Sequence, residues 1–157
     1  MDYDPKLTDL KRQIQNIFDG KKQVEKNSLV INIVKQAAKG VEYLHRKHGI
    51  VHRDIKIGNA LYNPETKEVK LIDFGFSKRL QVRERSNSRC GTRLAMAPEQ
   101  ALSVSGLHDT KVDVWSLGCL MLDLLSIRTP WRYSDIYEWG IALNDYQMAS
   151  IHKAKTF

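Results

Sequence analysis

The stretch that decides the fold is His52-Arg53-Asp54-Ile55-Lys56-Ile57-Gly58-Asn59. It places a carboxylate, an ammonium group and an amide close together, and two short apolar runs, Ile50-Val51 and Ala60-Leu61-Tyr62, flank it. Short apolar runs beside a polar loop are typical of strands. A carboxylate can accept a proton, and an amide oxygen is a hard ligand suited to a hard cation. The stretch therefore predicts a loop between two strands that carries the chemistry of the protein.

Three further motifs follow in order. Asp73-Phe74-Gly75 comes after another short apolar run, Ala97-Pro98-Glu99 comes next, and the run Asp113–Gly118 opens an apolar helical segment. Residues 73–99 show no regular apolar period, and a loop of that length is uncommon in a compact domain unless it is functional. Each tripeptide alone occurs by chance. Their order and their spacing from residues 52–59 make the set specific.

Together these motifs resemble the catalytic half of a eukaryotic-type Ser/Thr protein kinase. The resemblance implies that Asp54 and Lys56 are catalytic: Asp54 would orient the substrate hydroxyl and accept its proton, and Lys56 would contact the transferring phosphate. It implies ATP and Mg²⁺ as cofactors and a protein with Ser or Thr as the substrate. Lys56, Asn59, Leu61 and Asp73 would bind the nucleotide, and Asn59 and Asp73 would hold the metal.

The resemblance makes residues 76–99 an activation segment. Phosphate on Ser86 or Ser88 would add negative charge and would pair with Arg53, the arginine that precedes the catalytic aspartate. The alternative, that both serines are ordinary loop residues, is equally open. Thr92 matches the threonine that bonds the catalytic aspartate and lysine in Ser/Thr kinases.

Two departures from the family pattern concern the substrate-binding loop. Ala95 stands where the family usually has an aromatic residue, which removes packing under that loop and puts peptide recognition in doubt. Glu99 matches a glutamate that pairs with an arginine in the last helices, but no arginine follows Arg132. We therefore expect Glu99 to lack its buried partner, and an unpaired buried charge is costly.

The expected fold class is α+β and mainly α, a kinase-like C-terminal lobe with small β-hairpins around the catalytic loop, which is the stretch at residues 52–59. Asp113 would cap the catalytic loop through hydrogen bonds to its backbone. Apolar spacing predicts helices at residues 7–18, 28–48, 113–127 and 134–144, the second with Ser28 as N-cap, and strands at 50–51, 60–62 and 69–72. In the third helix the expected core residues are Trp115, Leu117, Leu120, Met121 and Leu124.

The N-terminal lobe of a kinase is not recognisable in these 157 residues, because they hold no Gly-x-Gly-x-x-Gly and no strand lysine followed by a helix glutamate. We expect a truncated kinase domain over 1–157, with a hinge remnant at 1–4, the C-lobe at 5–150 and a tail at 151–157. One hypothesis is a partial Ser/Thr kinase domain that is weak or inactive alone. The other is a catalytically dead half-kinase that binds or regulates another kinase by lobe exchange.

The amino-acid composition limits the class of protein that these hypotheses allow. With 42% hydrophobic residues the chain can bury a core for one domain. Its net charge of +7 suits an acidic partner such as nucleotide phosphate, or is simply a solvated basic surface. Cys90 and Cys119 form no metal spacing and no disulfide framework, so we expect an intracellular, cytoplasmic protein, with the nucleus as an alternative. Neither a signal peptide, a membrane span nor a nucleic-acid module is recognisable.

Overall fold

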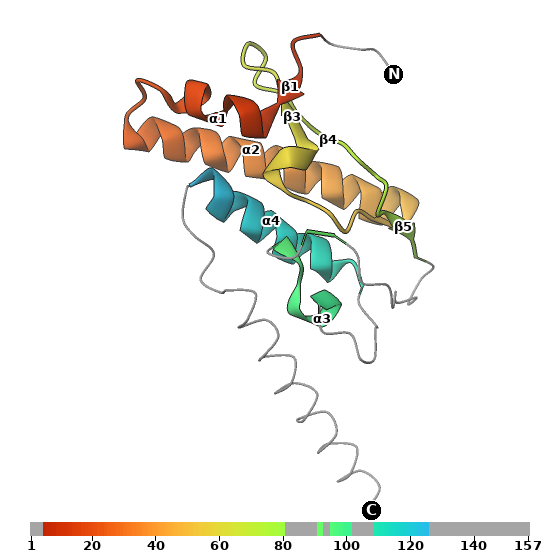
Figure 1. The fold of residues 1–157 in the computed structure, drawn as a ribbon. Coiled ribbons are helices and arrows are strands. Elements are labelled where there is room, and N and C mark those ends of the chain that lie inside the picture. The colour runs from red at the N-terminus through yellow and green to blue at the C-terminus, as the bar shows by residue number, and fades with distance from the viewer. Residues whose placement is uncertain (1–4, 81–90, 93–94, 102–108, 126–157) are drawn as a thin grey trace, which may run out of the picture.

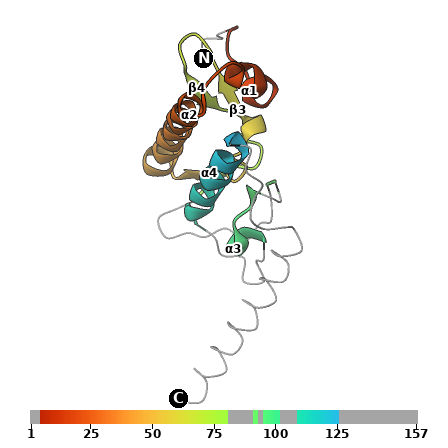
Figure 2. The same cartoon turned by 90° about the vertical axis from the view of Figure 1, so that its left-hand side faces the viewer.

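Two helices, α2 (Gln23–Tyr43) and α4 (Lys111–Leu124), pack against each other at the centre of the computed structural model, which describes residues 5–80, 91–92, 95–101 and 109–125. The short helix α1 (Leu10–Phe18) lies near the start of α2, and α3 (Pro98–Ala101) lies on the other side of α4 (Figures 1 and 2).

Two small antiparallel sheets flank the helices. The larger has the order β1-β3-β4 and the smaller pairs β2 with β5. In the larger sheet Ala60 pairs with Leu71 and Tyr62 pairs with Val69. The strands are β1 (Thr8–Asp9), β2 (Ile50–Val51), β3 (Ala60–Tyr62), β4 (Val69–Leu71) and β5 (Lys78–Arg79). β3 and β4 meet through a turn in which the Asn63 side-chain oxygen accepts the backbone N–H groups of Glu65 and Thr66.

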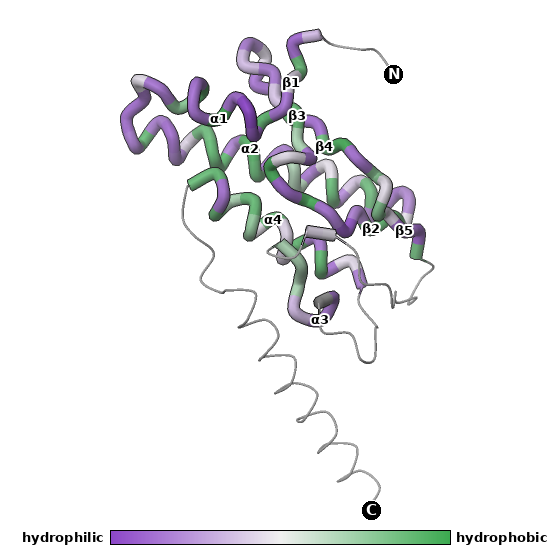
Figure 3. The backbone as a smooth tube through the Cα atoms, viewed as in Figure 1, coloured by the Kyte–Doolittle hydropathy of each residue, from purple (hydrophilic) through white to green (hydrophobic). Residues whose placement is uncertain are grey.

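The main core forms where α2 faces α4. The buried positions of α2 recur at helical spacing, as expected from the sequence, and those of α4 meet them from the opposite side. Along α4 the tube in Figure 3 is mainly hydrophobic, whereas most of α1 is hydrophilic. The core residues of the two helices are Val30, Ile33, Ala37, Val41, Leu117, Leu120 and Leu124. Burial of these side chains stabilises the helix pair by an amount that depends on apolar area, about 25 cal/mol per Å².

The start of α2 differs from the expectation. Ser28 is not an N-cap but lies inside the helix, which begins at Gln23. The Glu25 carboxylate accepts the backbone N–H of Lys22 at 2.8 Å, which satisfies a donor that the helix itself leaves unpaired. An acidic residue in the first turn is also favoured by the helix dipole. The first helix is likewise shorter than expected, because Asp9 caps it.

The end of α2 agrees with the expectation. Its last turn, Leu44–His48, widens into a π-helix, and Gly49 ends it in the left-handed conformation with φ of 61°. A Cβ at Gly49 would lie 2.8 Å from the carbonyl oxygen of Leu80, beside the β2–β5 pair. Gly49 is therefore required both by its backbone angles and by the close approach of another segment.

Other expectations need correction. Residues 73–99 are not wholly irregular, since β5 interrupts them. In α4, Leu117, Leu120 and Leu124 are buried as expected, Trp115 is partly buried, and Met121 is 38% exposed. Met121 shares an exposed strip of the helix with Val114, because α4 turns only part of its surface to α2. The expected hinge at 1–4, the helix at 134–144 and the tail at 151–157 lie outside the described residues.

Replacing Gly49 with alanine is expected to lower the free energy of unfolding by about 1–3 kcal/mol, because it adds backbone strain and a contact with Leu80. Gly20 is the matched control, since it has φ of 66° with nothing near its Cβ position. Urea denaturation of the two variants should show the larger loss for Gly49→Ala. Equal losses would show that the approach to Leu80 is unimportant.

Candidate active site

The loop at residues 52–59 is fixed to the core by one carboxylate. Asp113, in the first turn of α4, is fully buried. Its Oδ1 accepts the backbone N–H of Arg53 at 2.8 Å, and its Oδ2 accepts the backbone N–H of His52 at 2.8 Å. Nε2 of His45 donates to the same Oδ2 at 2.7 Å. The expected cap of the catalytic loop by Asp113 is thus confirmed, and His45 is an additional partner that no sequence motif predicts.

The backbone of the site adopts a strained conformation at two positions. Arg53 has φ of 68° and Asp73 has φ of 63°, both in the left-handed region that non-glycine residues rarely enter. The backbone N–H of Arg53 is bonded to Asp113. Its side chain also holds the loop, because Nε donates to the carbonyl oxygen of Phe76 at 2.6 Å. Such conformations cost about 1–3 kcal/mol each and persist where the surroundings enforce them, as they often do at functional sites.

The Asp54 carboxylate is the centre of a compact polar cluster. It is 3% exposed, and both of its oxygens accept hydrogen bonds. Oδ2 accepts from Nζ of Lys56 and from Nδ2 of Asn59, each at 2.8 Å. Oδ1 accepts from the backbone N–H of Thr92 at 2.8 Å and from its hydroxyl at 2.7 Å. Lys56 also donates to the Thr92 hydroxyl at 2.7 Å, so the structure brings these four predicted residues together.

These contacts determine the charge of Asp54. Burial alone would raise the pKa of its carboxyl, but the hydrogen bonds from Lys56, Thr92 and Asn59 and the charge of Lys56 outweigh burial and lower the pKa below its ordinary value. The carboxylate is therefore ionised at neutral pH. An ionised and well-oriented carboxylate can align a hydroxyl and accept its proton as that proton is released.

Asn59 is oriented toward Asp54 through its amide nitrogen. Nδ2 donates to the backbone carbonyl of Asp54 at 2.9 Å as well as to its carboxylate. Within the described part of the chain no hydrogen bond uses the side-chain oxygen of Asn59, which is the atom that a hard cation would bind.

Asp73 leaves the sheet at the same end as Asn59. The backbone N–H of Ile72 donates to the carbonyl of Asn59 at 3.0 Å, and Asp73 is the next residue along the chain. Its carboxylate is exposed, and Oδ1 accepts the backbone N–H of Gly75 at 3.2 Å. A carboxylate and an amide oxygen at one end of a hairpin suit Mg²⁺ in chemical type. Among the described residues no group of three or more His, Cys, Asp or Glu side chains is placed to hold a metal.

Phe74 contacts the catalytic loop rather than the main core. Its ring lies 4.9 Å from the ring of His52, centroid to centroid, and is 44% exposed. His52 is fully buried and donates from Nε2 to the carbonyl oxygen of Ile72 at 3.2 Å. His52 therefore joins the loop to the segment that carries Asp73.

Thr92 reaches Asp54 because Gly91 lies directly against the catalytic loop. Gly91 has φ of 110°, and a Cβ there would overlap the carbonyl oxygen of Arg53. Only glycine allows this approach. Gly91 has no recognisable role in the sequence, since a lone glycine in a long loop has no signal of its own.

The remaining predicted residues have mixed outcomes. Leu61 is half-buried in β3, where it pairs with Asp9 and Lys70, and its nucleotide contact stays a prediction. Glu99 is exposed, so the expected cost of a buried unpaired charge is wrong. Ala95, four residues before Glu99, is buried, and its carbonyl accepts the Ser116 hydroxyl at 2.7 Å. Ser86 and Ser88 lie outside the described residues.

The family is shown by comparison with known proteins. A family model for the protein kinase domain matches residues 5–156. The chain belongs to the protein kinase family, as its motifs predicted. Its helices and small antiparallel sheets are those of a kinase domain. Over the described residues no helix has the length and apolar character needed to cross a membrane.

Several curated kinases are similar in sequence. The chain is 40% identical over 107 residues to a mitogen-activated protein kinase kinase kinase, MCK1, of Pyricularia oryzae. It is 39% identical over 118 residues to the serine/threonine-protein kinase PLK1 of Xenopus laevis and 38% identical over 120 residues to a probable cell cycle serine/threonine-protein kinase, a CDC5 homolog, of Encephalitozoon cuniculi. These matches cover 66%, 73% and 74% of this chain but only 7%, 19% and 25% of the relatives.

Replacing Gly91 with alanine is expected to separate Thr92 from Asp54, because the carbonyl that the new Cβ meets is backbone and cannot rotate away. Hydrogen exchange at the Thr92 amide should become roughly tenfold faster or more as its bond to Asp54 opens. Gly118→Ala is the control, since nothing lies within 4 Å of its Cβ position. Unchanged exchange at Thr92 in Gly91→Ala would contradict the proposed close approach.

Replacing Asp113 with asparagine is expected to cost about 1–3 kcal/mol of unfolding free energy, because one buried N–H of the catalytic loop would face an NH₂ group in place of an acceptor. Asp123→Asn, at an exposed position of the same helix, serves as the control. Thermal or urea unfolding measures both. A loss no larger for Asp113→Asn than for Asp123→Asn would show that the Asp113 bonds do not hold the loop.

Proposed function

We propose that this chain forms the C-terminal lobe of a Ser/Thr protein kinase, with a hinge remnant at 1–4, the lobe at 5–150 and a tail at 151–157. The complete enzyme transfers phosphate from ATP to Ser or Thr of a protein substrate. The cluster of Asp54, Lys56 and Thr92 carries this proposal, because it joins an ionised carboxylate to a lysine in a buried setting. The likeness to named serine/threonine kinases supports the substrate class.

In this proposal Asp54 orients the substrate hydroxyl and accepts its proton. Its lowered pKa keeps it ionised, so an acceptor is always present at neutral pH. Lys56, 30% exposed at its side chain, contacts the transferring phosphate and offsets the developing charge. Thr92 holds both groups in place, and correct positioning supplies much of the rate enhancement in phosphoryl transfer.

Asn59 and Asp73 would hold Mg²⁺, and Lys56 and Leu61 would contact the nucleotide. Bound Mg²⁺ neutralises phosphate charge. The side chain of Asn59 fits this role, because its nitrogen is engaged by Asp54 and its oxygen is left for a cation. The exposed carboxylate of Asp73, at the same end of the hairpin, would supply the second oxygen ligand.

Regulation would act through the segment after Asp73. Phosphate on Ser86 or Ser88 would pair with Arg53, whose backbone is already part of the catalytic loop. The setting we propose is intracellular, in the cytoplasm or the nucleus.

Taken alone, these 157 residues should turn over ATP weakly. They contain no Gly-x-Gly-x-x-Gly and no strand lysine paired with a helix glutamate, so phosphates would be held from one side only. The second candidate function is a half-kinase that binds another kinase and completes or blocks it by lobe exchange. The same missing motifs and Ala95 in place of an aromatic residue favour that candidate.

Radiolabelled phosphate transfer from ATP to casein tests both functions. For the chain alone we expect a rate far below the usual range of about 1–100 per second. Adding a separately expressed N-terminal lobe of a Ser/Thr kinase should raise the rate. Asp54→Asn should lower the restored rate by about a hundredfold or more, because the proton acceptor is removed.

Glu42→Gln, which changes an exposed carboxylate that pairs with Arg46, is the matched control and should leave the rate unchanged. Restored transfer that survives Asp54→Asn would contradict the role of Asp54. Full turnover by the unaided chain would contradict the expected weakness. Inhibition of an intact kinase without restored transfer would select the half-kinase function.

A further inference from the structure

The outer side of α2 and the turn that follows it carry a row of cations. Its members recur at helical spacing, so they lie on one side of the helix. All of them are exposed, and within the described segments none of the lysines in the row forms an ion pair. A row of this kind indicates a surface that attracts anions. The row consists of Lys35, Lys39, Arg46 and Lys47.

Acidic side chains near this row in the sequence do little to neutralise it. Residues 27–52 contain one acidic residue, Glu42. Its carboxylate pairs with Arg46 at 3.1 Å, and both side chains are largely exposed. An exposed pair of this kind is weak, so a bound anion can replace Glu42 as the partner of Arg46. The row therefore keeps a net positive charge.

An exposed aromatic ring stands within the row. Tyr43 is 58% exposed, and its ring lies 5.0 Å from the ring of His48 in an edge-on arrangement. Residues five apart point to different sides of an α-helix, but the turn Leu44–His48 is a π-helix, which is wider and brings such residues together. Turns of this type are frequent at functional sites. The π-turn thus holds Tyr43 in place among the cations.

A contact from β5 fixes the end of the π-turn. Nε of Arg79 donates to the carbonyl oxygen of His48 at 3.0 Å, and this carbonyl is one that a helix end leaves unpaired. The strand is held by the N–H of Leu80, which donates to the carbonyl of Gly49 at 2.7 Å. Arg79 is exposed, so it also adds positive charge beside the Tyr43–His48 pair.

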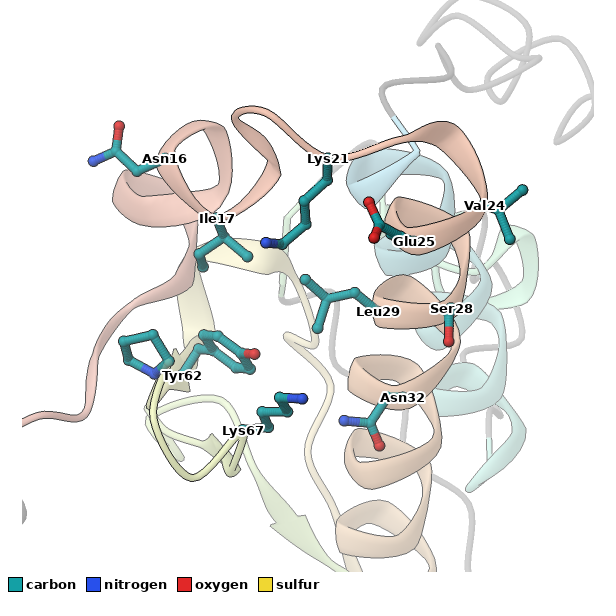
Figure 4. A pocket seen from close by; sticks show the side chains of 11 residues that line it. Asn16, Ile17, Lys21, Val24, Glu25, Ser28, Leu29, Asn32, Tyr62 and Lys67 are labelled. Carbon is teal, nitrogen blue, oxygen red and sulfur yellow. The ribbon is translucent and has the colours of Figure 1, made fainter.

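This surface is separate from the candidate active site and from a groove at the start of α2. That groove lies between α1, the first turns of α2 and the β3–β4 turn, and it is lined by Lys21 and Lys67 but by no member of the cation row (Figure 4). The cation row leads to the other end of α2, beside β5 (Figure 1). The proposed phosphoryl transfer uses none of its residues.

We propose that the cation row with Tyr43 and His48, the Tyr43 surface, binds single-stranded RNA. Proteins that bind single strands combine cations for the phosphates with exposed aromatic rings on which bases stack. From Lys35 to Lys47 the row extends about 18 Å, which is room for several nucleotides. Tyr43 stands between Lys39 and Lys47, so one strand can contact the ring and the cations at once. The Tyr43 hydroxyl and the His48 ring nitrogens can bond to the 2′-hydroxyl that distinguishes RNA from DNA.

Other anionic partners match this surface less well. A lipid surface takes up clustered apolar side chains, whereas Tyr43 is the one exposed large apolar side chain within residues 35–48. An acidic peptide would use the cations and leave the ring without a stacking partner. A duplex keeps its bases stacked inside. No nucleic-acid module is recognisable in the sequence, because the π-turn and β5 bring the ring and the cations together.

The experiment measures fluorescence anisotropy of a labelled single-stranded RNA of about twelve nucleotides, with alternating adenosine and cytidine, titrated with the full chain. We expect saturable binding that weakens as salt is added, because bound phosphates release counterions. The DNA strand of the same sequence should bind more weakly, and the RNA duplex more weakly still.

Variants separate the ring from the charges. Tyr43→Leu should weaken RNA binding by roughly fivefold or more through loss of base stacking, whereas Tyr43→Phe should keep most of the affinity. Lys39→Gln combined with Lys47→Gln should weaken binding by roughly tenfold. The slope of log affinity against log salt should become shallower by about 0.7 for each lysine removed.

Lys21→Gln combined with Lys67→Gln is the matched control, because it removes the same charge from lysines outside the Tyr43 surface. It should leave binding unchanged. Unfolding measurements verify that the variants are folded. RNA containing 4-thiouridine, cross-linked to the unchanged chain by light, should attach within residues 35–48, a result that needs no variant. Asp54→Asn should bind as the unchanged chain does, so the outcome is independent of the proposed function.

Four results would overturn the proposal. One is absence of saturable binding. Another is equal weakening by the matched control, which would show a response to net charge alone. The third is full affinity in Tyr43→Leu, or cross-links confined to other segments. The last is displacement of the RNA by polyglutamate or by phosphatidylserine vesicles at equal charge, which would show that the surface binds an acidic protein or a membrane.

Discussion

The buried carboxylate of Asp113 is the constraint on which the site depends. It accepts two adjacent backbone N–H groups of the catalytic loop and the ring N–H of His45, so both of its oxygens are used. A buried carboxylate is costly unless it is fully hydrogen-bonded. The helix and the loop therefore depend on each other. Helix α4 can bury Asp113 only if the loop supplies hydrogen-bond donors. The loop can hold Arg53 in a left-handed conformation only if the Asp113 carboxylate accepts the Arg53 N–H.

A second carboxylate, Asp54, lies in the same loop and has a different environment. Asp113 is surrounded by structural donors and has no opening to a ligand. Asp54 contacts Lys56 in the same loop and Thr92 from a segment far along the chain, and these partners keep its carboxylate ionised. The contact with Thr92 depends on Gly91, whose missing side chain lets the later segment touch the loop backbone. Burial of one carboxylate therefore positions the other for chemistry.

The groove beside α1 shows that the polar surface of this chain is not confined to the catalytic loop. Both regions use the β3–β4 hairpin: Asn59 and Asp73 lie at one end, and Tyr62 and Lys67 lie at the other. The hairpin is short and is fixed by Asn63 and Gln36. This hairpin therefore carries different side-chain chemistry at its two ends.

Local patterns in the sequence determined the family, the strands beside the catalytic loop and the apolar faces of α2 and α4, because motif order and periodicity are local properties. They did not determine that α2 begins at Gln23, that Met121 is exposed or that Glu99 lies at the surface. Helix ends depend on single side-chain bonds, and burial depends on which face a neighbouring element covers. The tertiary structure alone decided the contacts of Gly91 and His45, since each joins segments far apart in the chain and neither has a signature in its own neighbourhood.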